Sequence, residues 1–188
     1  VLVESKDLHY DALNEAIRAV AGEDFIITRP EHETVYDGLS TNQKLRLMTI
    51  QKDLPLDMHR PIWLRKQELT EVMVREQLKP DETLLATIRA LRKEHGYPLA
   101  VASNCIKSSV FNILDSIGVL PLVDAYFSNE DVQRAKPGPD IYLKACSTFG
   151  VPPESALVVE DSVKGFEACV RAGCPLFKVR GPEDVRAP

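Results

Sequence analysis

The sequence has no long uncharged apolar run of the kind that crosses a membrane. The best candidate, Gly96–Ile106, is shorter than the roughly 18 residues that such a span requires, and it contains Ser103 and Asn104. No secretory signal is visible at the N-terminus, and no internal repeat or low-complexity segment stands out. These absences predict a protein that has no membrane partner.

The sequence also lacks an excess of basic residues. It has 23 Lys and Arg against 28 Asp and Glu, which is a net charge of −5. Lysines and arginines do not cluster, and no series of aromatic residues is spaced to stack on bases. Because nucleic-acid-binding domains usually carry a basic excess, we expect no nucleic-acid partner.

Closely spaced cysteines are missing too. No pair of the four cysteines has the spacing of a zinc site, and the four histidines lie far from them, so a zinc site is not expected. Free thiols in a reducing cytoplasm are the simplest interpretation, and they predict a cytoplasmic location. The residues concerned are Cys105, Cys146, Cys169, Cys174, His9, His32, His59 and His95.

The 188 residues are enough for one domain, or for one domain with an insertion. The pattern changes near Lys79. Before it, apolar residues recur at helical spacing, as Leu8, Ala12 and Ile17 do, and no alternating strand pattern is visible. We therefore predict a helical domain over residues 5–78, preceded by a linker over residues 1–4.

From Lys79 onward, short apolar runs alternate with amphipathic segments. Continuous apolar strands that alternate with helices are typical of a parallel sheet covered on both faces, which predicts a doubly wound α/β core domain over residues 79–188. The expected strands are 98–102, 125–127, 156–159 and 175–179, and the expected helices are 81–95, 106–117, 140–149 and 163–172.

Polar residues follow the expected strands, at the edge where ligands bind in such sheets. Ser103 and Asn104 follow one strand, Glu160 and Asp161 follow another, and Lys136 lies between them in the sequence. A hydroxyl and a lysine suit a phosphate, and paired carboxylates suit Mg²⁺. Each residue alone has an ordinary explanation as a turn, a surface charge or a helix cap. Their order along the chain is more specific and points to phosphoryl transfer.

Together these segments resemble motifs of the haloacid dehalogenase-like (HAD) hydrolases, in the helical-cap subgroup that includes phosphoglycolate phosphatase and β-phosphoglucomutase. The resemblance covers nearly the whole chain and implies a Rossmann-like core with an inserted all-helical cap domain. It is carried by the segments 102–104 (ASN), 135–142 (AKPGPDIY), 158–162 (VVEDS) and 172–175 (AGCP), with 1–5 (VLVES) and 36–40 (YDGLS) in the cap region.

The resemblance also implies roles for individual residues in a Mg²⁺-dependent phosphatase of a small phosphomonoester. Ser103, Asn104 and Lys136 would bind the phosphate, and Ser103 and Lys136 would act in catalysis. The acidic pair would hold Mg²⁺, and two residues of the cap would contact the substrate. The acidic pair is Glu160 and Asp161, and the cap residues are His9 and Gly38.

One family motif is absent from the sequence. The family's first motif is Asp-x-Asp-Gly, whose first Asp is the nucleophile that forms an aspartyl-phosphate and whose second is the general acid/base. The 188 residues do not contain it, and the resemblance would place it just upstream of Val1, on a strand between 98–103 and 156–160. The chain as given is therefore expected to be inactive. Its sheet is expected to have a gap through which the chain could associate with a neighbour, and the oligomeric state stays open.

Three alternatives remain open. A sugar-phosphate mutase of the β-phosphoglucomutase type is disfavoured because Asp37 and Thr41 stand where that branch has basic residues. A dehalogenase is disfavoured because it needs no metal. A chain without the nucleophile could instead be an inactive binding protein. Among the histidines, His32, His59 and His95 are expected at the surface or at helix ends.

Overall fold

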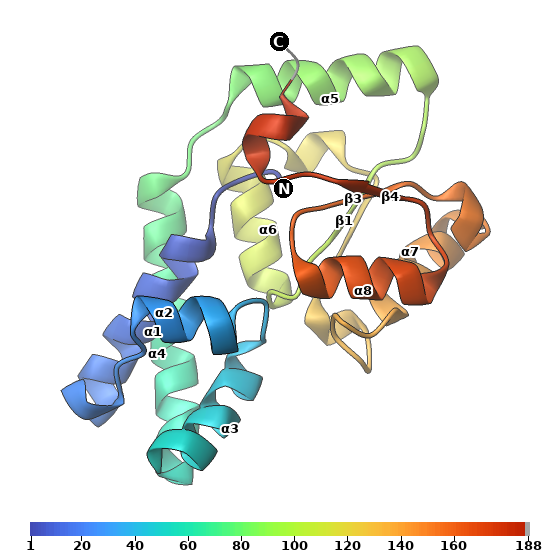
Figure 1. The fold of residues 1–188 in the computed structure, drawn as a ribbon. Helices are drawn as coiled ribbons and strands as arrows, with labels where there is room; N and C mark the ends of the chain where they lie inside the picture. Colours follow the sequence, from blue (N-terminus) through green and yellow to red (C-terminus); the bar gives the residue numbers. More distant parts are fainter. Residues whose placement is uncertain (187–188) are drawn as a thin grey trace. The chain divides into compact units, whose positions relative to one another are not determined.

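The computed structural model describes residues 1–186, and its contacts divide the chain into two compact units. One, called the helical unit here, comprises Ser5–Gln77. The other, called the core unit, comprises Val1–Glu4 and the residues from Leu78 onward. Figure 1 shows the elements of each unit. Within residues 1–186, no helix is long and apolar enough to cross a membrane.

The helical unit is built from two long helices and shorter elements between them. Its buried apolar residues include Ile17, Leu45 and Ile62, each with no exposed surface, and these residues come from three different helices. Ser40 caps the third helix by accepting a hydrogen bond from Gln43 N–H, as expected at a helix start. The helices are α1 (Lys6–Ala21), α2 (Arg29–Glu31), α3 (Thr41–Lys52) and α4 (His59–Gln77).

His32 was expected at the surface or at a helix end, and the structure shows the second of these. It follows α2 and begins a π-helical turn, His32–Tyr36, and only 5% of it is exposed. Its ring packs against Tyr10 with the centroids 5.0 Å apart. Burial, followed by the nearby charge of Lys44, lowers the pKa of His32 from 6.5 to about 4. Nothing in the sequence indicated that His32 is buried, because its burial depends on residues from other helices.

This buried histidine predicts a pH-dependent stability. Because the folded state keeps His32 neutral, the unfolded chain binds more protons below pH 6.5, so stability falls as the pH drops from about 6.5 to about 4. The loss is at most about 3.5 kcal/mol, at about 1.4 kcal/mol per pKa unit. Urea unfolding of wild type and His32→Gln at several pH values measures it. His32→Gln should lose this pH dependence, whereas the matched control His95→Gln, at an exposed position, should keep it. The prediction is contradicted if the free energy of unfolding changes with pH equally in wild type and in His32→Gln.

The core unit alternates helices and short strands. Several helices end at a glycine with positive φ, such as Gly150 and Gly173, whose left-handed conformation terminates the helix. The helices are α5 (Glu82–His95), α6 (Lys107–Ser116), α7 (Asp140–Phe149) and α8 (Val163–Ala172). The strands are β1 (Ala100–Ala102), β2 (Ala125–Phe127), β3 (Val158–Glu160) and β4 (Leu176–Lys178).

The strands form two parallel pairs. β1 pairs with β2, with Val101 opposite Tyr126, and β3 pairs with β4, with Val159 opposite Phe177. Among the described residues, no pairing joins β1 to β3. The strand 156–159 expected from the sequence begins later, because Ala156 N–H bonds to Pro153 O in a 3₁₀ turn. The other strands are equal to or shorter than expected.

Helices pack against both faces of the β1–β2 pair. Ala100 and Ala102 join the apolar cluster that α7 and α8 contribute, while Leu99 and Val101 join the cluster of α5 and α6. This alternation is the reason for the continuous apolar character of the strand, since each face is buried. It leaves the carboxyl ends of the strands as the edge where polar side chains can gather.

Candidate functional site

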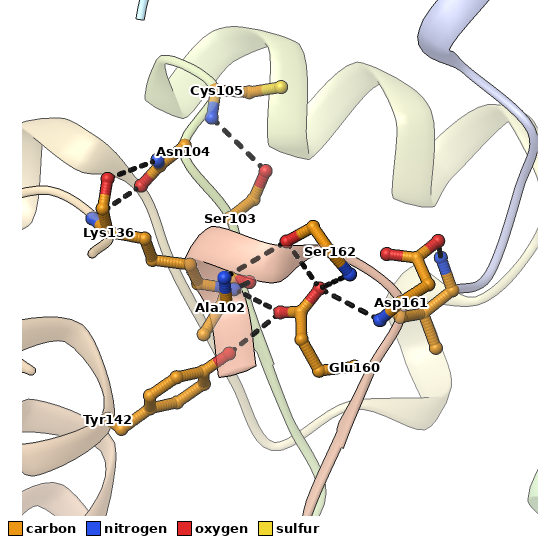
Figure 2. Close-up of polar contacts among 11 residues, drawn as sticks. Ala102, Ser103, Asn104, Cys105, Lys136, Tyr142, Glu160, Asp161 and Ser162 are labelled. Carbon is orange, nitrogen blue, oxygen red and sulfur yellow. Dashed lines mark hydrogen bonds and ion pairs between the residues drawn. The ribbon is translucent and has the colours of Figure 1, made fainter. Parts of the chain in front are cut away.

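The candidate site lies where β1 and β3 end. The loop after β1 carries Ser103 and Asn104, and β3 ends at Glu160 and is followed by Asp161. Lys136 comes from the loop before α7 and reaches into the same place (Figure 2). The five core residues predicted from the sequence are therefore held at one edge of the core unit by parallel strands.

Lys136 is the centre of this site. Its Nζ donates to Glu160 Oε2 at 2.7 Å and to the carbonyl of Ala102 at 3.0 Å. Only 7% of each of the Lys136 and Glu160 side chains is exposed. A buried lysine and a buried carboxylate need each other, because an unpaired charge in a protein interior is costly. The ion pair thus holds an ammonium at the strand ends.

Both oxygens of Glu160 have protein partners. Oε1 accepts hydrogen bonds from the backbone N–H of Asp161 at 3.0 Å and of Ser162 at 3.1 Å, and from Ser162 Oγ at 3.0 Å. Oε2 accepts from Lys136 and from the Tyr142 hydroxyl, each at 2.7 Å. Burial acts to raise the pKa of Glu160, but the charge of Lys136 and these hydrogen bonds outweigh it and lower the pKa to about 2.

The backbone of α8 passes close to the Glu160 carboxylate. A Cβ added at Gly165 would lie 2.1 Å from Glu160 Cδ, so only glycine fits there. Gly165 N–H also donates to Ser162 Oγ at 3.1 Å, which caps the start of α8. The Glu160-Asp161-Ser162 segment is therefore held from both sides, by its own hydrogen bonds and by the helix that follows.

Asn104 links the loop after β1 to the loop of Lys136. Its Oδ1 accepts from Lys136 N–H at 2.9 Å, and its Nδ2 donates to the Lys136 carbonyl at 3.0 Å. This pair of bonds mimics the pairing between two strands. The Asn104 side chain therefore sets the position of the Lys136 backbone, and the contact of Asn104 with the phosphate stays a prediction.

Ser103 stands on the loop after β1, where the chain leaves the sheet. Its N–H donates to the carbonyl of Phe127 at 3.0 Å, which extends the β1–β2 pairing by one residue. Its Oγ accepts from Cys105 N–H at 3.1 Å and shapes the turn. The side chain is partly exposed, and its hydroxyl proton is a donor for a ligand at this edge.

Asp161 follows the last residue of β3 directly, and 17% of its side chain is exposed. Among residues 1–186, no group of three His, Cys, Asp or Glu side chains is arranged to hold a metal ion. Mg²⁺ does not require such a group, because it keeps several waters and binds proteins through one or two carboxylates. Asp161 fits that requirement better than Glu160, whose oxygens are already engaged.

The two other predicted site residues belong to the helical unit. His9, which is partly buried, has its Nδ1 3.4 Å from Nζ of Lys66, a buried residue of α4. Gly38 has a φ of 67°, a left-handed conformation that favours glycine, and it lies between the π-helical turn and α3. The structure therefore places these residues in a different unit from the five core residues.

Sequence reasoning missed Tyr142. Tyr142 is the third residue of α7, at a position whose spacing marks it as part of the apolar core. Its hydroxyl donates to Glu160, which lies 18 residues away in the sequence. Burial and the charge of Glu160 raise the pKa of Tyr142, so its hydroxyl stays protonated and donates. A tyrosine at a buried helical position was the only available signal, since a buried hydroxyl needs a partner.

The fold and the site define an α/β protein that holds an ammonium, a hydroxyl and an acidic pair at the carboxyl ends of parallel strands. A family model described as haloacid dehalogenase-like hydrolase matches residues 1–173. The chain therefore belongs to the haloacid dehalogenase-like hydrolase family, and the family predicted from the sequence is confirmed.

Two relatives illustrate the similarity in sequence. Protein CbbY of Cereibacter sphaeroides is 30% identical over 183 residues, which are 92% of this chain and 76% of that protein. Validoxylamine A 7'-phosphate phosphatase of Streptomyces hygroscopicus subsp. limoneus is 38% identical over 76 residues, which are 40% of this chain and 36% of that protein. In three curated relatives the match spans only 64%, 36% and 27% of the relative's own length.

A solved structure shares the fold. The crystal structure of CbbY from Rhodobacter sphaeroides in complex with phosphate has a TM-score of 0.83 and 27% identity, and the match covers 96% of this chain and 82% of that chain. A mutant of the same protein was solved in complex with xylulose-(1,5)bisphosphate. This similarity confirms the α/β fold class predicted from the sequence.

Proposed function

We propose that this chain is part of a Mg²⁺-dependent phosphatase that hydrolyses a small phosphomonoester. The observation that carries the proposal is the buried Lys136–Glu160 pair, 2.7 Å from Nζ to Oε2, held beside Ser103 at the carboxyl ends of β1 and β3. A buried ammonium at such an edge suits an anion, and phosphoryl transfer depends mainly on electrostatic stabilisation of the phosphoryl oxygens.

The core unit supplies the proposed phosphate contacts. Ser103 donates its hydroxyl proton to a phosphate oxygen, and Lys136 offers the ammonium that balances the phosphate's charge. The Asn104 side chain holds the Lys136 backbone in place beside the proposed phosphate site. The family's nucleophile is an aspartate of the Asp-x-Asp-Gly motif, which the 188 residues do not contain, so the assay must use the full-length protein.

The acidic pair has two different tasks in this proposal. Asp161, which follows β3 and is partly exposed, would hold Mg²⁺ through a carboxylate oxygen. Glu160 acts next to the ion by orienting Lys136 and the backbone N–H of Asp161. When bound, Mg²⁺ would offset the negative charge of the phosphoryl group during transfer.

The helical unit is proposed to be the cap domain of the family, with the cap spanning residues 5–78 and the core 79–188. Caps of this kind exclude water while the phosphoryl group is transferred. His9 and Gly38 would then contact the part of the substrate that is not transferred. The names of the relatives support a small, polar, phosphorylated substrate of the sugar or cyclitol type.

A substrate panel with the full-length protein tests the proposal. Release of inorganic phosphate from sugar phosphates, ketose bisphosphates and cyclitol phosphates should require Mg²⁺, stop with EDTA and return when Mg²⁺ is restored. No release from any phosphomonoester would contradict the proposal. Interconversion of hexose phosphates without net release would instead indicate the mutase alternative.

A further inference from the structure

Tyr142 contacts both members of the buried ion pair. Its hydroxyl donates to Glu160 Oε2 at 2.7 Å, and its ring centre lies 4.7 Å from Lys136 Nζ. Figure 2 shows the hydroxyl directed at the same carboxylate that binds Lys136. Only 6% of Tyr142 is exposed. Its hydroxyl and its aromatic face therefore act on one charged pair, out of water.

These contacts leave the Glu160 carboxylate no freedom to rotate. Oε1 is held by the backbone N–H groups of Asp161 and Ser162, and Oε2 is held by Tyr142 independently of Lys136. Without the Tyr142 hydroxyl, Oε2 would have Lys136 as its only partner, and the two could shift together. The hydroxyl thus makes Oε2 a fixed acceptor.

A fixed acceptor fixes the ammonium. Lys136 Nζ carries three N–H donors, and two of them are used by Glu160 Oε2 at 2.7 Å and by the Ala102 carbonyl at 3.0 Å. Because the donors of an ammonium have tetrahedral geometry, two fixed directions determine the third. The direction of the third N–H therefore depends on where Oε2 is held.

We propose that Tyr142 is a positioning residue, which aims the third N–H of Lys136 at the phosphoryl group by holding Glu160 Oε2. This inference rests on the proposed function of Lys136 as a phosphate contact. Tyr142 itself touches no substrate in this account. Its effect on the reaction passes through Glu160 and Lys136.

Tyr142→Phe isolates the hydroxyl from the rest of the side chain. The ring stays in the apolar cluster with Ile141 and Cys146 and keeps its face toward Lys136, so packing and the cation–π contact are retained. Tyr126→Phe is the matched control, because Tyr126 is also partly buried in the core unit but packs in the other cluster, away from Lys136.

Steady-state kinetics of the full-length protein provide the first test. We expect kcat of Tyr142→Phe to fall about tenfold, the size of effect of losing one hydrogen bond to a charged group. KM should change less than twofold, because the ammonium still offers its charge to the bound ester while its N–H is misdirected in the transition state. Tyr126→Phe should match wild type. An unchanged kcat in a Tyr142→Phe protein with wild-type melting temperature would overturn the inference.

A spectroscopic readout separates this inference from the proposed function. The Lys136 ammonium is buried and hydrogen-bonded, so its ¹H–¹⁵N signal can be recorded and then assigned with Lys136→Met. Tyr142→Phe should shift this signal, while Tyr126→Phe should leave it in place. If wild type hydrolyses no phosphomonoester, the proposed function fails, and the spectrum alone decides on Tyr142. An unshifted signal in Tyr142→Phe would show that Tyr142 does not position Lys136.

Discussion

Replacing Lys136 by methionine is expected to lower phosphomonoester hydrolysis by about 10²–10³-fold and the free energy of unfolding of the core unit by about 3–5 kcal/mol. The stability loss arises because Glu160 stays buried, with 7% of its side chain exposed, after its ammonium partner is gone. The loss of activity arises because the phosphoryl oxygens lose their cationic partner, which is worth about 10²–10³-fold for a single preorganised donor. Phosphate release and urea unfolding measure the two effects.

Lys107→Met is the matched control for this substitution. Lys107 pairs with Asp131 at 2.9 Å, in the same unit, but 54% of its side chain is exposed. Exposed pairs contribute at most about 1 kcal/mol, so Lys107→Met should change stability little and leave activity unchanged. Adding Glu160→Gln to Lys136→Met should restore part of the stability by removing the unpaired charge. Equal stability losses for the two lysine substitutions would contradict the structural interpretation.

Replacing Asp161 by asparagine is expected to lower Mg²⁺-dependent hydrolysis by about 10²–10³-fold, while the protein stays folded. The substitution keeps the size of the side chain and one acceptor oxygen, and it removes the charge that a hard cation prefers. Asp161 has 17% of its side chain exposed and forms no ion pair with Lys136, so its loss should disturb the core unit less than the loss of Lys136. Hydrolysis at increasing Mg²⁺ concentrations measures the effect.

A binding measurement keeps this second prediction independent of turnover. Mn²⁺, which also prefers oxygen ligands, can be titrated and followed by electron paramagnetic resonance. Affinity should fall in Asp161→Asn and stay unchanged in Asp184→Asn, whose carboxylate pairs with Arg180 elsewhere in the core unit. Undiminished hydrolysis and cation binding in Asp161→Asn would exclude Asp161 as the metal ligand.

Local features of the fold follow directly from the order of residues. The helices Asp140–Phe149 and Val163–Ala172 were predicted with their observed bounds, because apolar spacing and a following glycine mark them within a few residues. The strand Ala125–Phe127 was also predicted as observed. Ser103 and Asp161 were predicted as site residues because each lies just after an expected strand, and Lys136 because it lies on the loop that follows Ala125–Phe127. Parallel strands bring their carboxyl ends together whatever the details of packing.

Tertiary packing decided what these residues do. Lys136 Nζ meets the Ala102 carbonyl from 34 residues away, and Tyr142 meets Glu160 from 18 residues away. Glu160 was expected to act at the metal, as a ligand or through water, and that role stays a prediction. The structure surrounds both of its oxygens with protein donors, which favours a positioning role that a pattern of neighbouring carboxylates cannot reveal.

The burial of His32 has the same origin. A histidine in a polar stretch suggests a surface position, and only the packing of Tyr10 and the surrounding helices encloses it. The sequence by itself determined the family, the alternation of strands and helices, and the residues at the strand ends, since these depend on short-range order. Tertiary structure alone decided which polar groups are buried and paired, because desolvation and hydrogen bonding depend on neighbours that lie far apart along the chain.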